Sequence, residues 1–287
     1  MDIGIGMPNT VPGATGSQML DWARRAEAAR FSGLATIGAV SFPGYEELTL
    51  FAAAGAVTER IRFMPNVLIS PARSTAELAK QAASVDQLTN GRLTLGLGVG
   101  WRPTDYQLTG RDFHRRGELF DEQLRGLQRA WAGEALADGT KPVGPPPVQQ
   151  PGPPIVLGGT ADASFRRVAE FASGWTAGGL PPDAVRGIVG KVQAAWSEAG
   201  REGKPRIVAL SYFGLGDTEE QSRSYIMDYY TVAGRDMAEM VAGSVLRTPE
   251  AIKGAIQAYE DAGVDEYFLD PTVPDPDQVD RLAEIVF

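Results

Sequence analysis

Short apolar runs rich in β-branched residues alternate with amphipathic helical segments along the whole chain. This alternation is typical of βαβ units around a parallel sheet. Eight runs have the composition of buried strands, at residues 3–5, 34–37, 61–69, 93–97, 155–157, 175–177, 207–213 and 267–269. Eight strands with helices between them predict an α/β fold, a single (β/α)8 TIM barrel over residues 1–287.

The helical segments carry apolar stripes that can cover such a barrel. The first of them places five residues at helical spacing, Met19, Trp22, Ala23, Ala26 and Arg30. The next is rich in alanine and contains Leu48, Phe51, Ala52 and Val57, which either pack on the barrel or form a subunit interface.

Signals for helix ends are also present. Ser74 followed by Glu77 has the pattern of a capping box. Thr248 and Pro249 suit an N-cap and the first helical position, and Gly263 suits the end of the same helix.

Two connections are longer than a minimal barrel needs, residues 98–116 after the fourth strand and 217–246 after the seventh. The second contains several tyrosines and methionines. Since the loops that follow barrel strands build the active site, both are candidate pocket walls. The Pro- and Gly-rich stretch 141–154 is interpreted as a surface crossing, because the strand–helix alternation resumes directly after it.

A doubly wound open sheet is the rival architecture. It would place a Gly-x-Gly-x-x-Gly phosphate loop after the first strand. Here Gly4 and Gly6 are followed by Met7, Pro8 and Asn9, which breaks that spacing. The barrel is therefore favoured.

Composition narrows the class of partner. The net charge of −9 disfavours nucleic acid and anionic membranes. The absence of cysteine excludes thiolate chemistry, and a single histidine, His114, excludes a multi-histidine metal site, so no metal is predicted. The first residues lack the features of a signal peptide and no apolar run is long enough for a membrane helix, so we expect a cytoplasmic protein.

The most informative segment is 90–101, which places Gly96, Gly98 and Gly100 on alternate positions at the fourth strand. Such glycines allow a planar group to approach the backbone, or they simply relieve crowding inside a barrel. Residues 78–92 and 95–101 closely resemble the hallmark of the luciferase-like flavin and deazaflavin oxidoreductase family. The similarity extends over residues 116–117, 121–122, 127–131, 157–159, 174–175 and 259–263, and thus over nearly the whole chain.

This resemblance implies reduced FMN, or the deazaflavin coenzyme F-420, as cofactor. It implies a non-prolyl cis peptide at Asn66 and Val67 that supports the flavin ring. It also implies a phosphate site at Gly158, Gly159 and Thr160, where the physics agrees: glycines permit close approach, and a helix N-terminus attracts an anion. Further cofactor contacts are expected at the end of the sixth strand, at Gly178 and Gly179.

Substrate contacts are expected from aromatic residues near the pocket, Trp101, Phe42 and Tyr106. His114 is the one candidate acid or base, although a histidine among arginines is more often a solvated loop residue. Arg73 and Arg102 are candidates for contacting an anion. The chain lacks the Asp-His pair that many F-420-dependent relatives have after the second strand, and has Trp101 where some carry a catalytic Glu.

The leading hypothesis is therefore a flavin-dependent monooxygenase, which uses reduced FMN from a separate flavin reductase and O2 to oxygenate a small organic substrate. The closest alternative is hydride transfer with F-420. Two others stay open: a flavin-binding protein without catalysis, and a barrel enzyme that acts on a phosphorylated metabolite without any flavin. The family resemblance also implies a homodimer.

Overall fold

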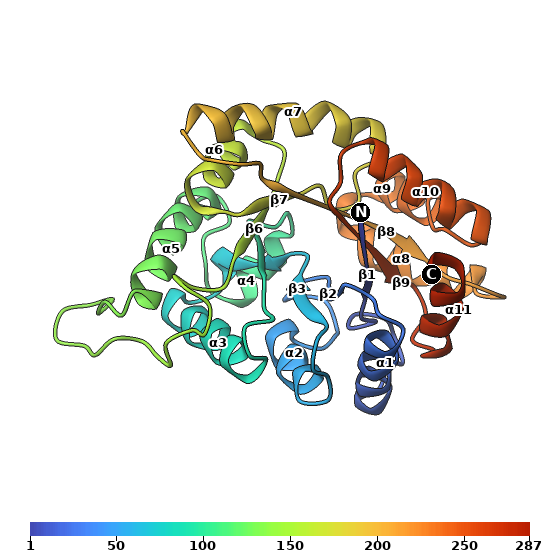
Figure 1. Ribbon diagram of the computed structural model, residues 1–287, viewed down its shortest axis with the longest axis horizontal. Coiled ribbons are helices and arrows are strands. Elements are labelled where there is room, and N and C mark those ends of the chain that lie inside the picture. Colours follow the sequence, from blue (N-terminus) through green and yellow to red (C-terminus); the bar gives the residue numbers. More distant parts are fainter.

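The computed structural model describes residues 1–287 and contains a ring of parallel strands surrounded by helices (Figure 1). Every strand pairs in parallel with its neighbours, in the order β3-β2-β1-β9-β8-β7-β6-β5-β4. The strands are β1 (Asp2–Gly6), β2 (Gly33–Thr36), β3 (Arg62–Pro65), β4 (Leu68–Ile69), β5 (Leu95–Gly98), β6 (Ile155–Gly158), β7 (Gly174–Thr176), β8 (Arg206–Phe213) and β9 (Glu266–Pro271).

The predicted third strand is divided in two by a cis peptide bond between Asn66 and Val67, the bond that the family resemblance implied. Its first half, β3, pairs with β2, and its second half, β4, pairs with β5. A bridge between Phe63 and Leu93 joins the two edges of the ring. The nine short strands thus occupy the eight positions of a barrel, and the predicted TIM-barrel fold is confirmed.

The helices are α1 (Gly16–Ala28), α2 (Glu47–Gly55), α3 (Thr75–Leu88), α4 (Pro103–Leu108), α5 (Arg116–Trp131), α6 (Asp162–Phe171), α7 (Pro182–Glu198), α8 (Glu219–Tyr230), α9 (Arg235–Gly243), α10 (Pro249–Asp261) and α11 (Asp277–Val286), with 3-10 turns η1 (Ser70–Ala72) and η2 (Thr231–Ala233). In α1 the predicted apolar stripe is buried as expected, except for Arg30, which lies beyond the end of the helix and is exposed.

Both of the long connections that the sequence analysis noted contain helices. The segment after β5 forms α4, and the segment after β8 forms α8, η2 and α9. The two ends of this second insertion lie side by side. Phe213 and Leu246 form a β-bridge, and the Leu246 amide donates to the Tyr212 carbonyl at 2.9 Å. The stretch 133–154 has no helix or strand and projects from the body as a loop (Figure 1).

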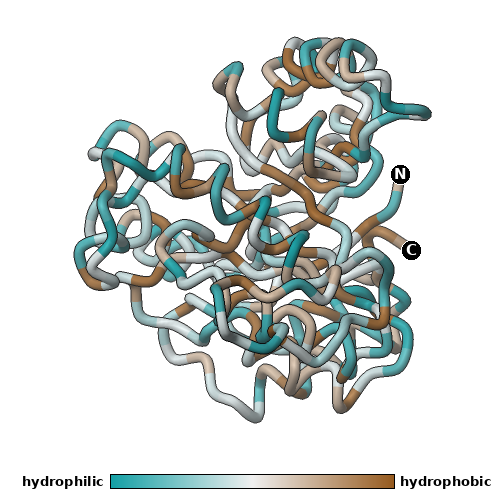
Figure 2. Tube along the Cα trace, turned by 90° about the vertical axis from the view of Figure 1, so that its left-hand side faces the viewer, coloured by the Kyte–Doolittle hydropathy of each residue, from teal (hydrophilic) through white to brown (hydrophobic).

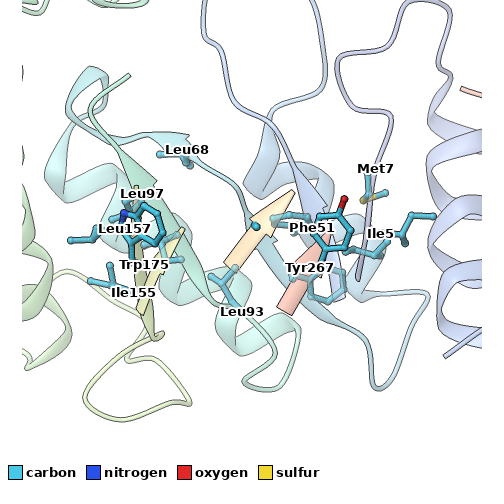
Figure 3. Packing of buried hydrophobic residues seen from close by; sticks show 14 of the residues in the cluster. Ile5, Met7, Phe51, Leu68, Leu93, Leu97, Ile155, Leu157, Trp175 and Tyr267 are labelled. Atoms are coloured by element: carbon cyan, nitrogen blue, oxygen red, sulfur yellow. The ribbon is translucent and has the colours of Figure 1, made fainter. Parts of the chain in front are cut away.

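The apolar side chains fill two layers. Hydrophobic stretches concentrate towards the inside of the trace and hydrophilic ones on its outer turns (Figure 2). Leu97, Leu157 and Trp175 are partners on three neighbouring strands and face the surrounding helices (Figure 3). Alternate strand residues point into the barrel, where Ala35, Met64, Val156, Val208 and Phe268 belong to a second cluster.

The amino-terminal end of the barrel is closed by an ion cluster around Glu266, which is only 2% exposed. Its carboxylate accepts from Arg62 at 2.9 Å, from Arg206, and from the Ser32 hydroxyl at 2.6 Å. These partners come from β3, β8 and the residue before β2, so the cluster ties distant strands together. In this fold that end serves stability, whereas chemistry takes place at the opposite end.

The two predicted helix caps differ in outcome. Thr248 accepts a hydrogen bond from the Ala251 amide, as predicted, and Gly263 follows the last turn of α10 with a φ of +88°. The capping box at Ser74 was wrong: Ser74 occupies the N-cap position of α3, but its side chain makes no cap hydrogen bond.

Thr248→Ala should therefore lower the free energy of unfolding by about 1 kcal/mol, because it removes the partner of an otherwise unsatisfied helix amide. Ser74→Ala is the matched control and should change it by less than about 0.5 kcal/mol. Urea unfolding followed by circular dichroism measures both. Equal effects of the two substitutions would contradict the assignment of the caps.

Candidate active site

A cavity of about 470 Å³ opens where the strands end at their carboxyl termini. Its wall is built by the residues that follow β2, β3, β5, β6 and β7, by the end of β8, and by α8. It brings together every predicted cofactor residue and one predicted substrate residue: Asn66, Val67, Gly158, Gly159, Thr160, Gly178, Gly179 and Trp101.

One side of this cavity is bare backbone, which we call the glycine wall: Gly98, Gly100, Gly158, Gly159, Gly178 and Gly179. A Cβ atom on Gly158 would meet nothing closer than Thr176 Cγ2 at 3.5 Å, so space, not crowding, surrounds it. Gly178 has a φ of +57° and nothing within 4 Å of a Cβ position. At Gly158, Gly178 and Gly179 the wall therefore leaves room for a flat group to lie against main-chain atoms.

Two glycines of the fourth predicted strand, Gly96 and Gly98, differ in their surroundings, because only Gly98 lies at the cavity. A Cβ on Gly96 would lie 1.8 Å from the Pro65 carbonyl oxygen, so this glycine is required by packing. Gly98 lines the cavity, and its Cβ would meet the Val67 side chain at 2.6 Å.

Asn66 offers an unused hydrogen-bond donor at the cavity. Its Oδ1 accepts from the Thr176 hydroxyl at 2.8 Å, while the buried Nδ2 has no partner in the protein. A buried donor without a partner costs about 1–3 kcal/mol. A ligand with an acceptor at this point would recover that cost, which fits the carbonyl and ring-nitrogen acceptors at the edge of a flavin.

The turn between β6 and α6 has the form of an anion site. Gly159 has a φ of +116°, and its carbonyl accepts from the Trp175 indole at 2.8 Å, which fixes the turn. No side chain caps α6, whose first N–H groups are free for a ligand. Asp162 in the first turn and Thr160 are both exposed. The arrangement fits the phosphate of a flavin nucleotide.

The cavity is also lined by three tyrosines, Tyr212, Tyr229 and Tyr230, which we call the tyrosine wall. The Tyr212 and Tyr230 hydroxyls are 3.0 Å apart, and the Tyr229 hydroxyl donates to the Gly38 carbonyl at 3.1 Å. Burial raises the pKa of all three phenols. They are therefore neutral hydrogen-bonding groups at physiological pH. Tyr229 and Tyr230 belong to the segment 217–246 that the sequence marked as a candidate pocket wall, whereas Tyr212 lies in the predicted seventh strand and was not expected at the pocket.

Trp101 and Arg102 join the loop after β5 to α8. The Trp101 ring, 44% exposed, lies nearly parallel to that of Tyr230 at a centroid distance of 6.1 Å. Arg102 is buried, donates to the Tyr229 carbonyl, and stacks 4.4 Å from the Tyr229 ring. Arg102 thus links the loop after β5 to α8, and its charge is not free to bind an anion in the cavity.

The other predicted site residues lie elsewhere. Tyr106 is 1% exposed and donates its hydroxyl to the Val99 carbonyl at 2.6 Å, so it packs beneath the loop. Phe42 lines a neighbouring, more polar cavity of about 510 Å³ and packs edge-on against Tyr229. Arg73 lines that second cavity too and is paired with Glu46 and Glu47. His114 is exposed and lines neither cavity.

The electrostatics of the first cavity are unusual for an enzyme site. None of its lining residues is Asp, Glu, His, Lys or Arg. No group of three or more potential ligands from His, Cys, Asp and Glu is placed to hold a metal ion.

Among the helices, none has the length and apolarity that crossing a membrane would require.

Comparison with known proteins identifies the family. The model of the luciferase-like monooxygenase family matches residues 1–286, and the chain therefore belongs to that family of oxidoreductases. An uncharacterized protein of Mycobacterium tuberculosis is 38% identical over 180 residues, which cover 60% of this chain and 62% of that protein. The FMNH(2)-dependent dimethylsulfone monooxygenase of Pseudomonas putida is 28% identical over 232 residues, covering 76% of this chain and 58% of that enzyme.

Solved structures share the fold. The monooxygenase RslO1 from Streptomyces bottropensis superposes with a TM-score of 0.79 at 21% identity, over 99% of this chain and 97% of that one. A secondary alcohol dehydrogenase dependent on F-420 gives a TM-score of 0.78 at 16% identity, over 99% and 98% of the two chains. Relatives of this chain thus use either a flavin or F-420.

Proposed function

We propose that the protein is a flavin-dependent monooxygenase that uses reduced FMN and O2 to oxygenate a small organic substrate. The observation that carries this proposal is a cavity lined by the bare backbone of the glycine wall and by neutral phenols, with no ionised side chain in its lining. Such a site has no ionised side chain and no nucleophile such as a thiolate in its lining, so we infer that the reactive group is supplied by a cofactor.

Each part of the site then has a task. The glycine wall lets the ring approach the backbone, Asn66 Nδ2 donates to an acceptor on the ring edge, and the N-terminus of α6 binds the phosphate. Reduced FMN, when bound, supplies the electrons that activate dioxygen. Trp101 and Tyr230, whose rings are nearly parallel, line the cavity and would help to keep water from a bound cofactor, which protects reactive species from side reactions.

The choice of reduced FMN over F-420 is supported by the composition of the cavity. Hydride transfer from an alcohol requires a base that removes the hydroxyl proton, and the lining contains no carboxylate, imidazole or amine. The dimethylsulfone monooxygenase relative points the same way. F-420 is the second candidate, because structures of F-420-dependent enzymes share the fold.

Two partners follow from the proposed reaction and from the family. A separate flavin reductase would deliver reduced FMN. We also propose a homodimer; Leu48 and Phe51, named as interface candidates, are buried in this chain's own core, so the interface would use other residues of α2 and α3, such as Leu88, which is 67% exposed. Light scattering that shows only monomer would contradict the dimer.

The deciding experiment titrates the purified protein with FMN, reduced FMN and F-420 separately, followed by absorbance and fluorescence. Tight binding of reduced FMN, and its faster reoxidation by O2 when a substrate is added, is the expected result. Preference for F-420 would assign hydride transfer instead. Binding without turnover on any substrate would indicate a non-catalytic flavin protein, and binding of neither cofactor would favour a phosphorylated metabolite as ligand.

His114→Ala should leave the rate of oxygen-dependent reoxidation of bound reduced FMN within about twofold of the wild-type rate, because an exposed residue outside the cavity contributes little. Stopped-flow absorbance measures this rate. A collapse of turnover with intact FMN binding would show that His114 takes part in the reaction.

A further inference from the structure

Asp270 is a carboxyl group inside the barrel that no part of the proposed site uses. It lies in β9 two residues after Phe268, and both point into the barrel because strand residues alternate. β1 makes room for them with two glycines. A Cβ on Gly4 would lie 2.3 Å from the Phe268 ring, and a Cβ on Gly6 would lie 2.1 Å from Asp270 Oδ1. The sequence of β1 thus accommodates this carboxyl group.

Nothing in the protein satisfies this carboxyl group. Asp270 is 4% exposed, and neither of its oxygens has a hydrogen-bond partner. The titratable groups around it are the phenols of Tyr212, Tyr225, Tyr230 and Tyr267. No charged side chain acts on it, and burial alone raises the pKa of Asp270 to about 7. A buried, unpaired carboxyl group of this kind exchanges its proton near neutral pH.

Two of the phenols lie near this carboxyl group and also line the cavity, Tyr212 and Tyr230. Tyr212 is the register partner of Asp270 on the adjacent strand, and with Tyr230 it lines the cavity. Their hydroxyls are hydrogen-bonded to each other at 3.0 Å. A hydroxyl accepts on one side and donates on the other, so the pair can pass a proton without becoming charged.

We propose that Asp270 is a positioning residue that holds one exchangeable proton beside the Tyr212–Tyr230 pair. When a ligand occupies the cavity, the carboxyl group turns to hydrogen-bond with this pair, which passes the proton to the ligand. In the transfer the O–H bond of the Asp270 carboxyl breaks and a bond from hydrogen to the ligand's oxygen or nitrogen forms. Each phenol gains a proton on one side and loses one on the other, and a carboxylate remains at Asp270. Solvent reprotonates it by the reverse route. This inference rests on the proposed function, since it takes the cavity as the ligand site.

The first test reports on the carboxyl group itself and needs no ligand. Infrared difference spectroscopy follows the C=O stretch of a protonated carboxylic acid as the pH is changed. The wild-type protein should show such a band that titrates with a midpoint near pH 7. Asp270→Asn should lack it, while Asp86→Asn, which changes a buried carboxyl group of α3 that is hydrogen-bonded to Gln149, should keep it. A wild-type protein without this band would overturn the proposal.

The second test measures the coupling to the ligand. Affinity for reduced FMN is determined between pH 5.5 and 8.5 for wild type, Asp270→Asn and Tyr230→Phe. Above the midpoint the wild-type affinity should fall about tenfold per pH unit relative to Asp270→Asn, because binding then requires uptake of the proton. Tyr230→Phe should lose this pH dependence but keep the infrared titration. A merely structural Asp270 would give parallel pH profiles for all three proteins, which would overturn the proposal.

Failure of the proposed function is recognised separately. If reduced FMN does not bind at any pH, the flavin assignment fails, and the infrared midpoint alone decides the role of Asp270.

The pH dependence of stability independently checks the direction in which the pKa of Asp270 is shifted. Because the pKa of Asp270 in the folded protein lies above that in the unfolded chain, wild-type stability falls as the pH rises from about 4 to about 7. Asp270→Asn should lack this decline, and an identical decline in both proteins would count against a titrating Asp270.

Discussion

Gly158→Val should lower the affinity for reduced FMN by at least about 100-fold, equivalent to about 2.7 kcal/mol, without unfolding the protein. The nearest atoms to a Cβ at this position are Thr176 Cγ2 at 3.5 Å and Val67 Cγ1 at 3.6 Å, which are ordinary contacts. A Cβ atom therefore fits at this position, and we expect the variant to fold. The two methyl groups of the valine extend over the glycine wall and occupy the space that the cofactor needs.

The measurement is a fluorescence titration with FMN and reduced FMN, accompanied by circular dichroism to establish that the variant is folded. Gly158→Ala should give a smaller loss of affinity, since it adds one carbon atom. Gly187→Val is the matched control, because this glycine lies in α7, where nothing approaches within 4 Å of a Cβ. Unchanged affinity in a folded Gly158→Val protein would remove Gly158 and Gly159 from the site.

Glu266→Ala should lower the free energy of unfolding by about 3–5 kcal/mol, because it leaves two arginines without the carboxylate that they share. Glu266 is buried at the closed end of the barrel and binds Arg62, Arg206 and Ser32. The affinity for FMN should stay within about threefold, since this cluster lies at the opposite end from the cavity.

Urea unfolding gives the free energy, provided that the m-value is unchanged. Asp2→Ala is the control: Asp2 also pairs with Arg62, at 2.9 Å, but both side chains are substantially exposed, so the expected loss is less than about 1 kcal/mol. If Glu266→Ala were no more destabilised than Asp2→Ala, the interpretation of this cluster as the closure of the barrel would be wrong.

Much of the fold could be predicted from the sequence because its signals are local. Strand and helix periodicity, and the Thr248 cap, depend on neighbours in the chain. The glycine wall was predicted for a similar reason, since Gly158, Gly159 and Gly178 stand directly after strands, where a barrel places its site. The predicted capping box was wrong. Ser74 stands at the N-cap position of α3, but its side chain makes no cap hydrogen bond, so residue type and spacing did not determine the contact.

What the sequence did not reveal depends on contacts between distant segments. Tyr106 and Phe42 were expected to contact substrate because they are aromatic residues in suitable loops, yet one packs under its loop and the other faces the neighbouring cavity. The partners of Arg102 come from a helix more than a hundred residues away. Asp270 gave no signal at all, because its isolation becomes visible only when β1, β8 and β9 lie side by side.

The bridge between Phe213 and Leu246 makes the segment between them a replaceable cassette. Because its two ends are already held together, a longer or shorter cassette would not disturb the register of β8, and the entropy of closing a loop grows only slowly with its length. Tyr229 and Tyr230 of the tyrosine wall lie on this cassette, whereas Tyr212 and the glycine wall belong to the strands of the barrel and the loops that follow them. Evolution, or an engineer, can therefore exchange the part that meets the substrate while the part suited to the cofactor is inherited unchanged.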